Sequence, residues 1–214
     1  MTRPDAAIED GSGPGPFTQT PPTAVYEMRM LRSAAEREEA AALVQDHQDV
    51  PMRHGALAPA RADIPAHFRD ARNSSAGLFE DGILLACMIP DRNPDLGWGE
   101  GPCLFLRSVH ALPGKSVDIT PMITLWASDF AARLGLPCVR AEVTTGLGYA
   151  REPRADFCHR LINCGWDLCG SGKGRDGNRS VRLELLAECR PGLHALISCR
   201  VHLPEPVSHD RSSA

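Results

Sequence analysis

The residues with the clearest chemical potential lie between a predicted strand and a predicted helix. The strand covers residues 103–110 and the loop residues 111–119. Thr120 is a good N-cap residue, and Pro121 suits the first helical position, where a missing N–H costs nothing. Free N–H groups and the helix dipole converge where a loop runs from a strand end into a helix N-terminus, so this segment predicts an anion site.

A glycine-rich loop at residues 171–178 also carries a cation, Lys173. It resembles a phosphate-binding P-loop only superficially. No glycine stands five residues before Gly172, and Gly174 follows the lysine where Ser or Thr is needed. We interpret this loop as a hairpin turn.

Eight cysteines would suit four disulfides in a secreted chain, but the sequence has no export signal and no Cys-x-x-Cys pair. Most of them stand among apolar neighbours, so we interpret them as free thiols that act as small hydrophobes. The group of Cys158, His159, Cys164 and Cys169 matches no common zinc spacing. We therefore predict no metal site.

Composition narrows the class of protein. The 214 residues carry a net charge of −4 and are 43% hydrophobic, which fits one domain with a real core. With no long basic run, nucleic acid and anionic membranes are poor partners. Without an apolar run of roughly 18–20 residues and without a signal peptide, we expect a cytoplasmic protein with no membrane span.

The segments around the candidate anion site alternate between strand and helix patterns. Ser33 and Glu36 form a capping-box signature, Asp63 precedes a short helix, and Asp81-Gly82 joins two β-rich runs as a hairpin. We predict strands at residues 24–31, 75–80, 83–89, 103–110, 138–144, 166–170 and 180–186, and helices at 33–47, 63–72, 120–134 and 155–164. Residues 1–22 are expected to be a disordered leader, residues 23–188 the domain, and residues 189–214 a partly disordered extension.

This order of elements resembles the GNAT superfamily, the Gcn5-related N-acetyltransferases, from about residue 25 to residue 188. Three local matches support the resemblance: the Asp81-Gly82 hairpin before the 103–110 strand, the loop and helix at 115–134, and the Leu161–Trp166 segment. The resemblance implies an α+β fold, a mixed sheet with the order β-α-α-β-β-β-α-β-α-β-β. The strands at 103–110 and 138–144 would be a central parallel pair that splays apart.

The resemblance also implies transfer of an acetyl or other short acyl group from acyl-CoA to an amine of a small molecule. The pantetheine arm would lie along Ser108, Val109, His110 and Ala111 in the gap between the splayed strands. The pyrophosphate would lie on Lys115, Ser116, Val117, Asp118, Ile119 and Thr120. Members of the family often dimerise through late strands, so a homodimer is an expectation here.

The implied catalytic groups are His110, Glu142 and Tyr149. His110 falls at the splayed strand end, and its reference pKa suits a base near neutral pH. Glu142 is a second candidate base, and Tyr149 is a candidate acid because the family's usual tyrosine position holds Leu161. The family's two loop glycines are replaced by Asp118 and Thr120. The alternative is therefore a GNAT-fold protein that has lost ordinary CoA transfer and binds another ligand or partner, or performs different chemistry in the same cleft.

Overall fold

The computed structural model describes residues 24–52, 63–92, 94–144, 154–175 and 177–201. Its strands form one eight-stranded mixed sheet in the order β6-β7-β5-β4-β3-β2-β1-β8. Neighbouring strands are antiparallel except the pairs β4/β5 and β1/β8, which are parallel. The elements are β1 (Tyr26–Met30), α1 (Ala34–Met52), α2 (Ile64–Arg69), β2 (Ala76–Glu80), β3 (Ile83–Asp91), β4 (Leu104–Ala111), α3 (Ser116–Arg133), β5 (Cys138–Thr144), α4 (Arg154–Asn163), β6 (Asp167–Lys173), β7 (Arg179–Leu186), the 3-10 helix η1 (Pro191–Ala195) and β8 (Ile197–Arg200).

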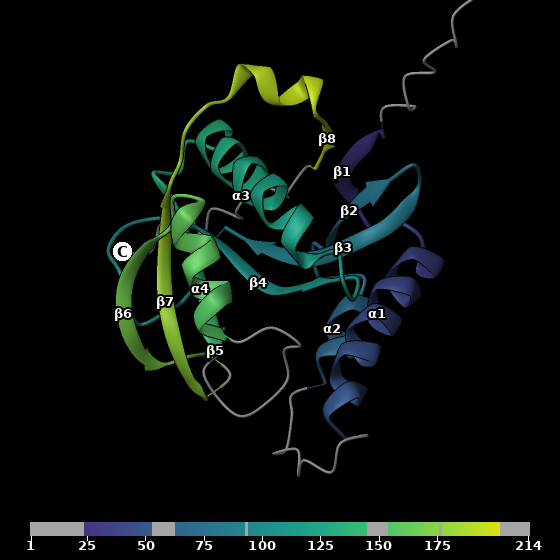
Figure 1. The fold of residues 1–214 in the computed structure, drawn as a ribbon, viewed down its shortest axis with the longest axis horizontal. Coiled ribbons are helices and arrows are strands. Elements are labelled where there is room, and N and C mark those ends of the chain that lie inside the picture. The colour runs from purple at the N-terminus through teal and green to yellow at the C-terminus, as the bar shows by residue number, and fades with distance from the viewer. Residues whose placement is uncertain (1–23, 53–62, 93, 145–153, 176, 202–214) are drawn as a thin grey trace, which may run out of the picture.

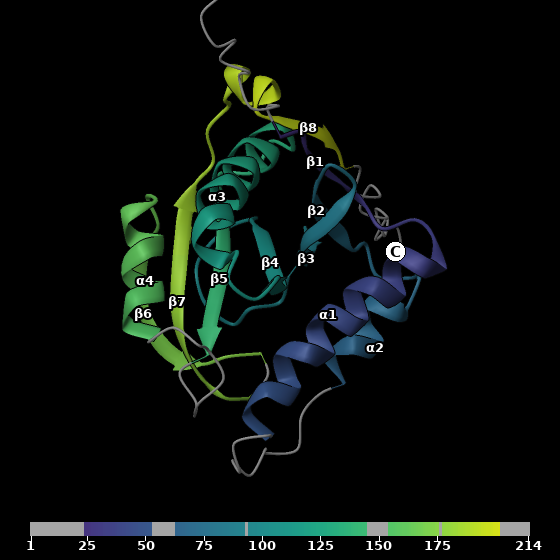
Figure 2. The ribbon, with the colours of Figure 1, turned by 45° about the vertical axis from the view of Figure 1, so that its right-hand side comes forward.

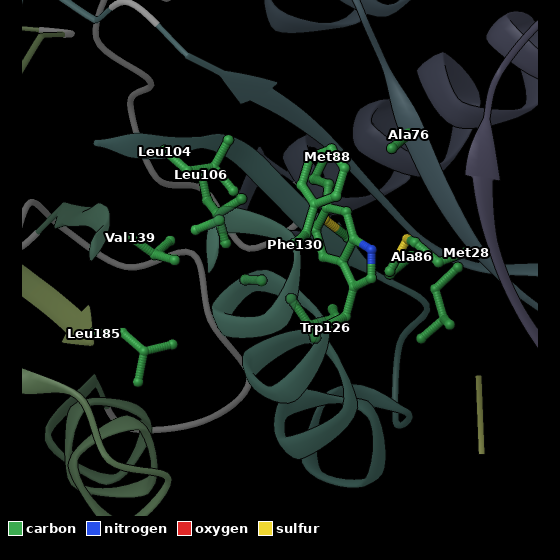
Figure 3. Packing of buried hydrophobic residues seen from close by; sticks show 14 of the residues in the cluster. Met28, Ala76, Ala86, Met88, Leu104, Leu106, Trp126, Phe130, Val139 and Leu185 are labelled. Atoms are coloured by element: carbon green, nitrogen blue, oxygen red, sulfur yellow. The ribbon is translucent and has the colours of Figure 1, made fainter. Parts of the chain in front are cut away.

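Helices cover both faces of the sheet, with α1 and α2 on one face and α3 and α4 on the other (Figures 1 and 2). The larger core lies beneath α3, where Trp126 and Phe130 stack with their ring centroids 5.2 Å apart (Figure 3). Leu104, Leu106 and Val139 from the central strands pack against this pair of rings. The smaller core lies beneath α1 and α2 and contains Leu31, Ala40, Ala41, Leu43, Val44, Phe68, Phe79, Leu84, Cys87 and Ile89. The predicted α+β class and the element order through β7 are confirmed.

Three local sequence signals form the structures that their chemistry predicts. Asp81 and Gly82 have φ angles of 50° and 84°, as a tight hairpin turn requires. Ser33 and Glu36 exchange hydrogen bonds of 3.1 and 3.0 Å between side chain and backbone, which is a capping box. The Asp63 side chain accepts the Ala66 N–H at 3.1 Å and caps α2.

The predicted start of the central helix is wrong. Helix α3 begins at Ser116, so Pro121 lies inside the helix instead of at its first position. Thr120 does not cap the helix either: its hydroxyl donates to the Ser116 carbonyl at 2.5 Å, one turn back. The Pro-Gly turn at residues 113–114 is a second start signal seven residues upstream of Thr120-Pro121, and Gly114 there has a φ of 84°.

The chain after β7 adds a strand that the sequence analysis did not anticipate. Two buried polar residues of α3 hold the connection: Ser128 donates to the Leu186 carbonyl at 2.8 Å, and Asp129 accepts the Arg190 N–H at 2.7 Å. Strand β8 then pairs with β1, with Ile197 opposite Tyr26. Residues 197–200 are therefore part of the sheet.

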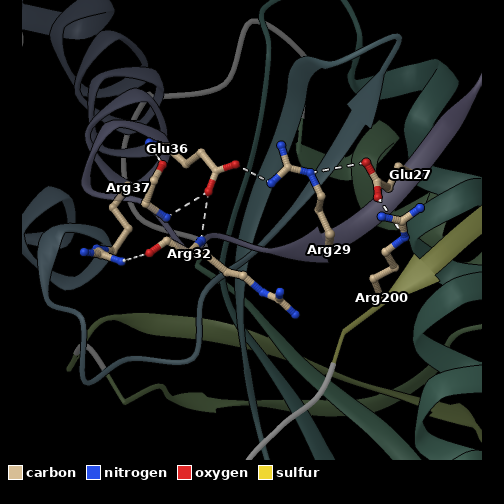
Figure 4. Close-up of polar contacts among 7 residues, drawn as sticks. Glu27, Arg29, Arg32, Glu36, Arg37 and Arg200 are labelled. Atoms are coloured by element: carbon tan, nitrogen blue, oxygen red, sulfur yellow. Dashed lines mark hydrogen bonds and ion pairs between the residues drawn. The ribbon is translucent and has the colours of Figure 1, made fainter.

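An ion-pair chain connects this new edge to the first helix (Figure 4). Arg200 of β8 lies 3.3 Å from Glu27 of β1, and Glu27 lies 3.3 Å from Arg29. Arg29 in turn pairs with Glu36 of α1. The last strand, the first strand and the first helix are thus joined through four charged side chains.

Candidate functional site

The central parallel strands separate after three paired positions. Leu104, Phe105 and Leu106 pair with Val139, Arg140 and Ala141, and the register between β4 and β5 ends there. From Glu142 onward β5 pairs only with β7, and from Arg107 onward β4 pairs only with β3. The two strands diverge toward their C-terminal ends (Figure 2). This divergence leaves a V-shaped opening, along which β4 has no partner strand among the described residues.

A β-bulge lies in β4 at the start of this opening. Cys87 faces His110 and Ile89 faces Arg107, so Met88 alone faces both Ser108 and Val109. Ser108 has a φ of 53°, a conformation that a residue with a Cβ adopts at an energetic cost. Bulges redirect side chains and end strand pairing, and this one separates Arg107 from His110.

The N-terminus of α3 keeps free backbone donors. The first N–H of the helix to find an acceptor in the described chain is that of Asp118, which donates to the Lys115 carbonyl at 3.1 Å. Lys115 occupies the N-cap position without a side-chain cap bond. The N–H groups of Ser116 and Val117 therefore precede the hydrogen-bonded ladder, and helix N-termini of this kind attract anions. Asp118 places a carboxylate within the same first turn.

Lys115 is engaged by the hairpin between β2 and β3. Its Nζ atom lies 3.5 Å from Glu80 Oε2, and Tyr26 donates its hydroxyl to Glu80 Oε1 at 2.6 Å. The hydrogen bond from Tyr26 and the charge of Lys115 lower the pKa of Glu80, while the bond to Glu80 raises the pKa of Tyr26. The lysine that the resemblance assigns to the pyrophosphate is thus held by a carboxylate.

The three candidate catalytic residues have different surroundings. His110 is half-buried beneath α2, and its ring meets the buried Phe68 ring edge-on at 6.3 Å between centroids. Glu142 has both carboxylate oxygens occupied, by the Trp98 indole N–H at 2.8 Å and by the Arg175 backbone N–H at 2.9 Å. Tyr149 lies outside the described residues. Glu142 therefore joins two loops to β5, while His110 stands beside the bulge.

Sequence reasoning missed a polar group on the face that α1 and α2 cover only in part. Trp98 comes from the loop between β3 and β4, and Arg175 comes from the loop between β6 and β7. Arg175 lies 3.4 Å from Asp91 and 5.7 Å from the Phe105 ring centroid, and Arg107 follows on β4. The sequence held two signals: an arginine inside an apolar strand, and Trp98 among the alternating glycines 97, 99 and 101.

Cys87 and Cys138 are poorly suited to act as nucleophiles. Burial raises the pKa of the Cys87 thiol to about 12 and that of Cys138 to about 11, which keeps both from forming thiolates. All eight cysteines are free thiols, and Cys169 and Cys189 are exposed. Strands β6 and β7 pair antiparallel with Lys173 opposite Arg179, as the predicted hairpin requires. None of the described helices is long and apolar enough to cross a membrane.

No protein-family model and no curated protein matches the sequence. Solved structures do match the fold. An N-acetyltransferase from Staphylococcus aureus Mu50 superposes with a TM-score of 0.54 at 11% identity, over 77% of this chain and 99% of that one. A GNAT-family acetyltransferase from Listeria monocytogenes 4b F2365 gives 0.54 at 13% identity, over 75% and 94%. The ribosomal-protein-S18-alanine N-acetyltransferase from Escherichia coli gives 0.51 at 13%, over 77% and 95%. The chain has the GNAT fold.

Proposed function

We propose that this protein transfers an acyl group from acyl-CoA to an amine of a small molecule. The observation that carries the proposal is the divergence of β4 and β5 after Leu106 and Ala141, with a bulge at Ser108 where the opening begins. The edge of β4 that no described strand pairs with suits an extended ligand that carries amides, as the pantetheine arm does. The GNAT fold supports acyl transfer as the reaction class.

The residues around the opening fit an acyl-CoA substrate. Ser108, Val109, His110 and Ala111 would pair with the pantetheine arm. The N–H groups of Ser116 and Val117 would bind the pyrophosphate at the helix N-terminus. Lys115 would add a positive charge if its ammonium turns from Glu80, which it contacts at a long 3.5 Å.

His110 is the proposed base. A neutral amine attacks the thioester carbonyl, so a C–N bond forms and the C–S bond breaks. The amine proton passes to the imidazole, and the electron pair of the broken bond leaves on the CoA sulfur. Glu142 is less suited to accept this proton, because two N–H groups already donate to its oxygens. We assign Glu142 a positioning role for the loops that carry Trp98 and Arg175.

Calorimetric titration with acetyl-CoA tests the proposal. We expect saturable binding, a several-fold weaker Kd for Lys115→Ala, and an unchanged Kd for Lys173→Ala, the matched control on exposed β6. His110→Gln should retain acetyl-CoA affinity and lose most of the turnover in an assay of thiol release with an amine mixture. Absence of binding up to millimolar acetyl-CoA would refute the acyl-CoA proposal.

The second candidate is a GNAT-fold protein that does not carry out ordinary CoA transfer. Asp118 favours it, since its carboxylate lies in the first turn of α3, where a pyrophosphate would bring more negative charge. Asp118→Asn separates the two candidates. It should tighten acetyl-CoA binding several-fold if the pyrophosphate lies there, and should change nothing if CoA is not a ligand.

A further inference from the structure

Arg107 is the one charged residue of β4 and lies where the strand leaves β5. The register places it opposite Ile89 of β3, immediately before the bulge. Its guanidinium reaches toward Asn73, just after α2, so the side chain lies on the α2 side of the sheet. His110 also lies on that side, against Phe68 of α2.

The hydrogen-bonding capacity of Arg107 is largely unused. Its Nη2 atom lies 3.4 Å from Asn73 Oδ1, which is the limit of a hydrogen bond. Its Nε atom is fully buried and has no partner in the described chain. An arginine presents five N–H donors, and a buried donor without a partner costs free energy. Burial lowers the pKa of the Arg107 guanidinium, while Asp91 opposes that effect and Arg175 adds to it.

Arg107 shares its one nearby carboxylate with Arg175. The charged groups that act on it are Asp91 and Arg175. Asp91 already lies 3.4 Å from an Arg175 nitrogen, so one carboxylate faces two guanidinium groups. The carboxylate of Glu142 accepts the Arg175 backbone N–H and is not among the charges that act on Arg107, so a ligand carboxylate would be the second negative charge at Arg107. A carboxylate supplies one negative charge and matches the planar guanidinium fork, whereas a phosphate dianion would bring two.

Arg107 and His110 are placed to contact the same small molecule. They lie on the same side of β4, and the bulge makes their separation along the strand that of about two ordinary residues, roughly 7 Å between Cα atoms. Both residues lie on the part of β4 that no longer pairs with β5. An amine that reaches His110 therefore has its other end near Arg107.

We propose that the acyl acceptor is an amino acid or another amine that bears a carboxylate, and that Arg107 binds the carboxylate. This inference rests on the proposed acyl transfer, because it identifies the acceptor class of that reaction. The positive charge of Arg107 fixes the acceptor in an orientation that presents its amine to His110. An acceptor that carries an amide in place of the carboxylate leaves the guanidinium unpaired and binds more weakly.

The test uses pairs of acceptors that differ only in this group. The probes are the common α-amino acids, β-alanine and 4-aminobutyrate, each with its primary amide, and aminomethylphosphonate as the phosphonate arm. The measured quantity is kcat/KM for thiol release from acetyl-CoA. Taking the acid-to-amide ratio for each variant relative to the unmodified protein cancels the difference in amine basicity within a pair.

We expect the accepted carboxylate to exceed its amide at least tenfold and Arg107→Gln to remove this preference through KM. Arg107→Lys, which keeps the charge without the fork, should fall between the two. Arg72→Gln is the matched control, because the Arg72 side chain is 91% exposed after α2. Equal use of acids and amides would overturn the carboxylate proposal and leave acyl transfer standing. A preference for the phosphonate would also overturn it.

A binding measurement separates this inference from the reaction. In a thermal-shift titration without acyl-CoA, the preferred carboxylate should raise the Tm of the unmodified protein and of Arg72→Gln but not that of Arg107→Gln. That result without any acyl transfer would support the carboxylate site and overturn the proposed reaction. Absence of any carboxylate-dependent shift or turnover across the panel would overturn the assignment of Arg107.

Discussion

Protonation of Glu36 should weaken the attachment of α1 to the sheet. Glu36 accepts the Ser33 and Arg32 N–H groups and pairs with Arg29 of β1 (Figure 4). Burial alone would raise the pKa of its carboxyl, but the bond from Ser33, the bond and charge of Arg29, and the bond from Arg32 together lower it to about 2. The ionised form is therefore the one that the folded protein favours.

The sign and size of the effect follow from linkage. A carboxyl whose pKa falls from 4.5 to about 2 on folding stabilises the protein fully above its unfolded value, and that stabilisation is lost as the pH falls toward 2. A fall in the pKa from 4.5 to about 2 corresponds to about 3 kcal/mol of stability. Because the Glu36 side chain is 22% exposed, solvent screening reduces this stabilisation, and we expect Glu36 to contribute about 2 kcal/mol to the free energy of unfolding.

Urea denaturation at a series of pH values between 7 and 3 measures this contribution. Glu36→Gln should lower the free energy of unfolding by about 2 kcal/mol at pH 7, and its difference from the unmodified protein should shrink toward pH 3. Glu38→Gln is the control on the same helix: Glu38 also pairs with an arginine, Arg69, but its side chain is 60% exposed. If the Glu36→Gln and unmodified profiles run parallel across this range, the electrostatic account of Glu36 is wrong.

Three further substitutions test the backbone and the loops around the opening. Ser108→Gly should keep the free energy of unfolding within about 0.5 kcal/mol, and Ser108→Val should lose about 1–2 kcal/mol, because a branched residue tolerates positive φ poorly. Trp98→Phe removes the N–H bond to Glu142, so urea denaturation should show a loss of about 1 kcal/mol, whereas an unchanged midpoint would mean that this bond adds nothing. Gly99→Ala should lower the Tm more than Gly97→Ala. Both glycines have positive φ, but of the two only Gly99 would place a Cβ 2.5 Å from the guanidinium of Arg140 on β5. Equal losses of Tm would exclude that clash.

The sequence predicted those parts of the fold that depend on neighbouring residues. The Asp81-Gly82 turn needs two adjacent residues that accept positive φ, and the capping box of Ser33 and Glu36 needs residues three apart. The strand at residues 138–144 was predicted with its observed bounds because its apolar face alternates and Gly135 and Pro137 precede it. Local chemistry decides such features.

The predictions that failed depend on contacts between distant segments. Strand β8 forms because buried Ser128 and Asp129 of α3 hold the chain after β7, more than 55 residues away along the sequence. The start of α3 failed for another reason: Thr120-Pro121 is a good helix start, but a second one lies at the Pro-Gly turn upstream. The sequence did not predict a role for Arg107, because the charged residues that act on it, Asp91 and Arg175, come from distant segments that the sheet brings together.

Because α3 begins at Ser116, its N-terminus differs from the one that the sequence predicted. With a helix that began at Thr120, Asp118 or Thr120 would have filled the N-terminus by capping it. In the observed helix Thr120 bonds backward to Ser116, and Asp118 lies inside the first turn without a capping role. The free N–H groups of Ser116 and Val117 therefore stay available to a ligand, and the obstacle to a pyrophosphate is the charge of Asp118. Salt screens the charge of Asp118, whereas it would not remove a side chain that capped the helix N-terminus. Raising the ionic strength should consequently weaken acetyl-CoA binding less in the unmodified protein than in Asp118→Asn, because the repulsion that salt relieves is present only in the former.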